Sequence, residues 1–136
     1  MTVTLTLTDQ DKNTLRTAAY GAVALIAAAT TGSPHKAAAH GSVALATAVG
    51  PVGHVLAERS AVKDLGGRSV ADLADRVLPA LTAAMGLLKE RHPAEADDFR
   101  RIVLVAVETA AQVRKSGPGP VLADMTRRIT GALDAA

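Results

Sequence analysis

Histidines are the side chains of this sequence best suited to bind a metal or to move a proton near neutral pH, and there are four: His35, His40, His54 and His92. His35 and His40 are five residues apart, which on a helix separates them by about 140° and prevents the i, i+4 pairing of a His-Glu-x-x-His zinc site. His40 and His54 lie in a long uncharged stretch, where a hydrogen-bonded structural histidine is the simpler interpretation. The alternatives are that His40 or His54 is a haem axial ligand or a general base, or that it is the polar anchor for an apolar ligand or cofactor bound in a helical bundle.

Closely spaced carboxylates are the second candidate for chemistry, and they form two pairs. Asp72 and Asp75 share one face of a predicted helix, and Asp97 and Asp98 stand at the start of another. Acid–base work or cation binding needs desolvation or a partner set at a defined distance. Both pairs instead fall in a first helical turn, where the helix dipole favours acidic residues. We therefore expect a structural role for them and no metal site.

Composition and motifs exclude most other catalytic chemistries. The chain has no cysteine, which rules out disulfides, thiolate zinc sites, iron–sulfur clusters and cysteine nucleophiles. It also lacks a Gly-x-Gly-x-x-Gly loop, a Walker loop and a Gly-x-Ser-x-Gly elbow. The sequence predicts a non-catalytic protein without a cofactor.

Charge and aromatic content argue against a nucleic-acid partner. The formal net charge is +2, and residues 69–136 contain nine basic and nine acidic side chains. One tyrosine and one phenylalanine provide no stacking platform for single-stranded nucleic acid. Two prolines in the Gly-Pro-Gly-Pro segment 117–120 remove the amide donors that a phosphate-binding loop needs.

Targeting and membrane signals are also weak. The first ten residues have neither a basic region nor a long apolar core, so we expect no secretory signal peptide. The apolar stretch 17–30 is shorter than the roughly 20 residues that cross a bilayer, and the stretch 37–56 is rich in alanine and contains glycines, a proline and two histidines. The expectation is a cytoplasmic protein that does not enter a membrane.

The elements that must position these residues are predicted to be helices, preceded by a short extended arm. Residues 2–7 alternate threonine with valine or leucine, which is typical of an extended segment, and we assign residues 1–8 to the arm. Thr8 and Asp11 then have the spacing of a capping box at the start of a helix.

Residues 9–136 are predicted to form one all-α domain, a bundle of about five helices. Helix starts and stops are marked by serine, proline and glycine, and Ser33 and Ser69 are expected N-caps. Within the segment 93–113, residues 99–113 are apolar almost all round, which predicts a helix at the centre of the bundle. The expected helices cover residues 8–30, 34–49 with a short helical piece continuing to 59, 69–91, 93–113 and 121–133.

Two segments of the chain share a pattern of apolar helix, glycine-marked turn and second helix, over residues 15–50 and 102–133. This pattern resembles the tellurite-resistance TerB-like helical domains, which are built from paired helices joined at an alanine-rich turn. In that family the turn carries Ala-Asp-Gly followed by a glutamate, and these acidic residues bind metal. The corresponding turns here read Thr30-Thr31-Gly32 and Lys115-Ser116-Gly117. The resemblance therefore implies paired helices without the family's metal site.

Residues 17–57 form the most unusual region, because Lys36 is their only charged side chain. A helical hairpin on a monomer's surface normally has a charged outer face, so this hairpin is either wrapped by the later helices or covered by a second copy of the protein. We favour a homodimer, and with it a non-catalytic interaction or scaffold protein that self-associates and has a further protein partner of unknown identity. The alternative is a binding module for an apolar small molecule. The small residues expected to allow close helix approach are Gly21, Ala28, Gly41, Ala44 and Ala48.

Overall fold

The computed structural model describes residues 7–29, 34–48, 50–57, 69–112 and 120–136, and these residues form six helices and no strand. The helices are α1 (Asp9–Ala29), α2 (Pro34–Ala46), α3 (Gly50–Ala57), α4 (Val70–Arg91), α5 (Pro93–Ala111) and α6 (Pro120–Asp134). The all-α prediction is confirmed, and the helix count is six because the short piece after residue 50 is a helix of its own. Six of the eight residues assigned to the N-terminal arm, and the expected N-cap Ser33, lie outside the described residues.

Two of the predicted helix caps are confirmed in atomic detail. The Thr8 amide donates to Asp11 Oδ2 over 3.1 Å, and the Asp11 amide donates to Thr8 Oγ1 over 3.0 Å, so both halves of a capping box are present. At the start of α4, the Asp72 amide donates to Ser69 Oγ over 3.1 Å. The beginning of α1 is further held by Arg91, which ends α4 and donates to Asp11 Oδ2 over 2.8 Å.

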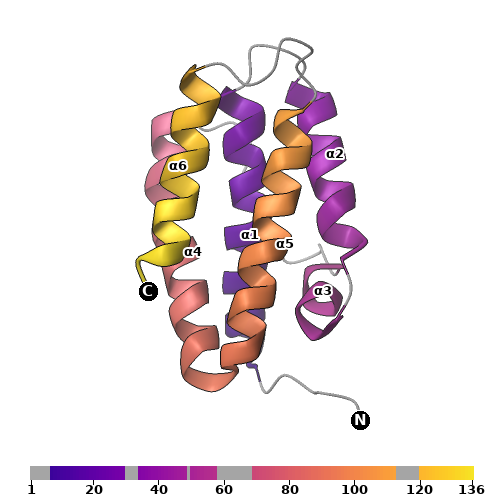
Figure 1. The fold of residues 1–136 in the computed structure, drawn as a ribbon, viewed down its shortest axis with the longest axis vertical. Helices are drawn as coiled ribbons and strands as arrows, with labels where there is room; N and C mark the ends of the chain where they lie inside the picture. The colour runs from indigo at the N-terminus through magenta and orange to yellow at the C-terminus, as the bar shows by residue number, and fades with distance from the viewer. Residues whose placement is uncertain (1–6, 30–33, 49, 58–68, 113–119) are drawn as a thin grey trace.

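Helix α1 occupies the centre of the bundle. Figure 1 shows it with α4 and α6 on one side, α2 on the other and α5 in front, and it contacts all five other helices. No side chain of α1 between Leu15 and Ala27 is exposed. A helix without charged residues over most of its length is thus buried by its own chain.

The prediction that the segment 93–113 is the central helix needs correction. Helix α5 does contact the other five helices, but it leaves one face in solvent, and Val105 on this face is 48% exposed. The reason is a polar stripe at helical spacing, because Asp97, Arg101 and Glu108 all stay exposed. Arg101 and Glu108 thus belong to one solvent-facing stripe of α5.

Candidate functional site

Helix α2 is an outer helix with one buried and one exposed face. Ala37, Gly41 and Leu45 recur every four residues and are buried against the bundle, where α2 packs on α1 and α5. The exposed side chains follow the same spacing on the other side of the helix and are Lys36, Ala39, His40, Val43 and Ala46. Lys36 stands in the first turn, so the rest of this face carries no formal charge.

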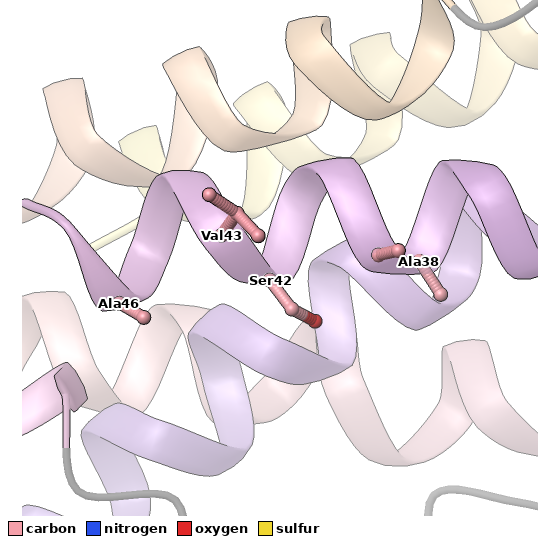
Figure 2. A pocket seen from close by; sticks show the side chains of 5 residues that line it. Ala38, Ser42, Val43 and Ala46 are labelled. Atoms are coloured by element: carbon pink, nitrogen blue, oxygen red, sulfur yellow. The ribbon is translucent and has the colours of Figure 1, made fainter.

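The outer face of α2 is apolar and slightly hollowed. A shallow groove of about 330 Å³ is lined, among the described residues, by Ala38, Ala39, Ser42, Val43 and Ala46. Figure 2 shows four of these side chains along α2, with the Ser42 hydroxyl as the polar group among them. Val43 is 60% exposed, which leaves a large apolar side chain beside the groove.

Helix α3 lies on the same side of the bundle as α2 and contacts it (Figure 1). Its buried residues face inward, and its exposed residues Gly50, His54 and Ala57 bring no formal charge when the histidine is neutral. We call the exposed residues of α2 beyond Lys36, together with those of α3, the α2–α3 surface. Its members are Ala39, His40, Val43, Ala46, Gly50, His54 and Ala57.

Two polar side chains of α1 fix the C-terminal end of α3. Arg16 is only 6% exposed and donates from Nε to the Val55 carbonyl over 2.9 Å. One turn further along α1, the Tyr20 hydroxyl donates to the Leu56 carbonyl over 2.6 Å. The last carbonyls of a helix have no partner within the helix and carry the negative end of its dipole. A buried guanidinium and a phenol therefore complement this end of α3.

The other end of α3 begins at a glycine that the backbone requires. Gly50 has φ of +91°, a conformation that residues with a Cβ rarely adopt. The Asp98 carboxylate of α5 lies 3.4 Å from the position that a Cβ on Gly50 would take, which places a negative charge near the start of α3. Both ends of this eight-residue helix are thus complemented by charge from the bundle.

The α2–α3 surface lacks the charged side chains that every other outer helix of the described structure exposes. Each of α4, α5 and α6 exposes at least three charged side chains, and the Arg100–Asp134 ion pair, at 2.8 Å, joins α5 to α6. The two other large exposed apolar residues, Val105 and Val121, stand within one turn of such charges. The exposed charged residues are Asp72, Asp75, Arg76, Lys89, Glu90 and Arg91 on α4, Asp97, Arg101 and Glu108 on α5, and Asp124, Arg127, Arg128 and Asp134 on α6.

In the described part of the chain, the groups with a shifted pKa lie in helix–helix ion pairs and a helix cap. The amide of Thr8 lowers the pKa of Asp11, with a smaller contribution from the Arg91 guanidinium and against the effect of desolvation. A hydrogen bond from Arg100 lowers the pKa of Asp134, and the same bond raises the pKa of Arg100. These shifts have structural causes at the ends of α1 and α6.

The histidines proposed as cofactor anchors, His40 and His54, lie on the α2–α3 surface. Both side chains are exposed and neither enters the bundle core. In the described part of the chain, no group of three or more histidine or acidic side chains is placed to hold a metal ion.

The residues predicted for self-association are divided between two environments. A Cβ on Gly21 would lie 2.5 Å from Val77 Cγ2 of α4, and a Cβ on Gly41 would lie 2.6 Å from Val23 Cγ1 of α1, so both glycines serve close approach within the chain. Ala28 is exposed at the end of α1, whereas Ala44 on α2 and Ala48 just after α2 are half-buried.

Sequence reasoning overlooked the residues that dominate the exposed face, namely Ala39, Val43 and Ala46. Their 3–4 residue spacing was visible in the sequence. Nothing local, however, distinguished this face of α2 from the equally apolar face that packs on the bundle.

No helix in the described ranges has the combination of length and apolar character that a membrane span requires. Comparisons with models of protein families, with curated proteins and with solved structures found no match for this chain. The resemblance to TerB-like domains therefore stays a prediction, and the α2–α3 surface is argued from its own residues.

Proposed function

We propose that this protein is a non-catalytic interaction protein that self-associates through the α2–α3 surface, the outer part of the hairpin 17–57. One observation carries the proposal: the exposed face of α2 has no charged side chain after Lys36 and presents Val43 at 60% exposure. Burial of such a face in a protein contact is favourable, at about 25 cal/mol per Å² of apolar area removed from water.

The character of this surface also restricts its partner. A charged side chain facing it would lose its water without gaining an opposite charge, which is costly. The partner must therefore offer an uncharged surface. Because α4, α5 and α6 all expose several charges, the matching surface in the described molecule is the α2–α3 surface itself. A second copy can present it through a two-fold axis, the most common arrangement of homodimers.

The shape of the groove favours a protein partner over the alternative, an apolar small molecule. A volume of about 330 Å³ is at the lower end of ligand pockets, which bury most of the ligand surface. This groove is shallow and is lined by successive turns of α2, so it covers one side of whatever it receives. A single side chain that projects from a partner protein, in contrast, can bind in a shallow groove of this kind.

The test is the mass of the protein in solution, measured by light scattering over a concentration series. We expect the wild type to be dimeric at high concentration and Val43→Glu to be a folded monomer. Val121→Glu on α6 is the matched control, because Val121 is 63% exposed and the charged Asp124 lies one turn away. This control should keep the wild-type mass.

Two results would contradict the proposal. One is a wild type that stays monomeric at the highest concentration reached. The other is a Val43→Glu variant that keeps both the wild-type mass and the wild-type dependence on concentration.

A further inference from the structure

We infer that two copies pair with their α2 helices antiparallel, about a two-fold axis that passes beside Ser42 and Val43, so that Val43 of each copy enters the α2 groove of the other. This inference rests on the proposed self-association and specifies its geometry. Other arrangements are compatible with a dimer, including contact of α2 with α3 or with a different face of the second copy.

The first argument is the arrangement of a projection and a hollow on one helix. Val43 is 60% exposed and forms one wall of the groove, whose other lining residues are Ala38, Ala39, Ser42 and Ala46. A two-fold axis at this level places the projecting side chain of each copy over the hollow of the other. Because both features belong to the same turns of α2, the contact is complementary to itself, as a two-fold interface requires.

The second argument is the position of the one charge on this helix face. Lys36 stands in the first turn of α2, and the last turn contains no basic residue. A parallel pair would bring the two Lys36 side chains together at one end. An antiparallel pair instead brings each Lys36 toward the C-terminal end of the partner helix, where the carbonyls carry the negative end of the dipole. Charge therefore selects the antiparallel orientation.

The length of α2 limits how strong this contact can be. Thirteen residues make a helix about 20 Å long. A stable interface buries about 800 Å² on each partner, more than the exposed face of so short a helix offers. Exposed residues of α3 must then join the contact, and we expect a dimer that dissociates on dilution.

Cysteine crosslinking tests the geometry directly, because the natural chain has no cysteine. A disulfide forms only where the two Cα atoms approach within about 4.4–6.8 Å, so a single introduced cysteine links two copies only if it lies near the two-fold axis. The variants are Val43→Cys and Ser42→Cys, and the second keeps the projecting valine in place. Val121→Cys, at a valine of equal exposure on α6, is the control for random collision.

Under mild oxidation we expect Ser42→Cys or Val43→Cys to give a covalent dimer on a non-reducing gel, at least tenfold faster than Val121→Cys. Equal rates at all three positions would overturn the inference, because crosslinking would then be collisional. Absence of crosslinking at Ser42 and Val43 in a protein that light scattering shows to be dimeric would also overturn it, while the proposed self-association would still stand. A monomeric wild type would remove both.

Discussion

Helices α1 and α2 follow each other in the chain and are almost uncharged after residue 16, yet they lie in opposite environments. Lys36 is the only charged residue between positions 17 and 57, which includes most of α1 and all of α2. Yet α1 has no exposed side chain from Leu15 to Ala27, whereas α2 leaves a whole face uncovered. The absence of charged residues therefore does not determine whether a helix is covered by its own chain.

The difference follows from how many helices are available. Helix α1 contacts all five others, which is enough to surround it (Figure 1). Helix α2 packs on α1, α3 and α5 and has no neighbour on its outer side in the described structure. Of the two explanations for the uncharged hairpin, wrapping by later helices therefore applies to α1, and covering by a second copy is proposed for α2.

The contrast between α1 and α2 is tested most strongly by introducing one glutamate into each helix. Ala22 of α1 is fully buried, so Ala22→Glu should lower the free energy of unfolding by about 3–5 kcal/mol, the typical loss for an unpaired buried charge. Ala39 of α2 is exposed, so Ala39→Glu should change the stability of the monomer by less than about 0.5 kcal/mol.

Urea unfolding followed by circular dichroism measures both variants at a concentration where the wild type is monomeric. Equal destabilisation by Ala22→Glu and Ala39→Glu would show that α2 is covered within one chain, and the contrast between the helices would be lost. Light scattering of Ala39→Glu at high concentration adds a check on the proposed dimer.

Local signals in the sequence were enough for the helices and their ends. The Thr8–Asp11 box and the Ser69 cap depend on residues three positions apart, so they are visible without the fold. The α2–α3 corner was visible as a break at Gly50, although the short piece after it was not counted as a separate helix. The two helix caps are formed by hydrogen bonds within one helical turn, so the local sequence is enough to predict them.

Burial of whole helices was not predictable in the same way. The segment 93–113 has more large apolar residues than α1, but charges at helical spacing keep one of its faces in water. Gly21 and Gly41 were predicted to allow close approach between two copies, and in the fold they allow close approach between helices of the same chain. Which apolar face packs inward is decided by contacts between elements far apart in sequence, and one sequence alone does not contain them.

Glycine substitutions sharpen the comparison at the level of packing. Gly21→Ala on α1 should lower the free energy of unfolding by about 1–2 kcal/mol, because overpacking against the buried, branched Val77 outweighs a gain of about 1 kcal/mol in helix propensity. Gly131→Ala on the outer helix α6 is the control, because nothing lies within 4 Å of its Cβ position. It should raise stability by about 0.5–1 kcal/mol. If both substitutions stabilise the protein, α1 is packed more loosely than the structure indicates.

Acid titration addresses the starts of the two helices and should give the smallest effect. Helix α1 begins with a capping box whose carboxylate also accepts from Arg91, whereas the first turn of α2 contains no acidic residue. The pKa of Asp11 is lowered below its ordinary value of 3.8, chiefly by the Thr8 amide. A carboxyl with a lowered pKa in the folded state contributes stability that is present above that ordinary value and lost as the pH falls through the folded pKa.

Stability should therefore decline below about pH 4, and Asp11→Asn should remove part of this decline, because the variant has no proton to gain. Arg91→Met should remove a smaller part, since the Thr8 amide still holds the carboxylate. Melting temperatures of the three proteins between pH 5 and about pH 2.5 measure both effects. A decline in Asp11→Asn as steep as that of the wild type would show that the charge on Asp11 does not anchor the start of the central helix. The stability of that helix would then depend on its apolar packing alone.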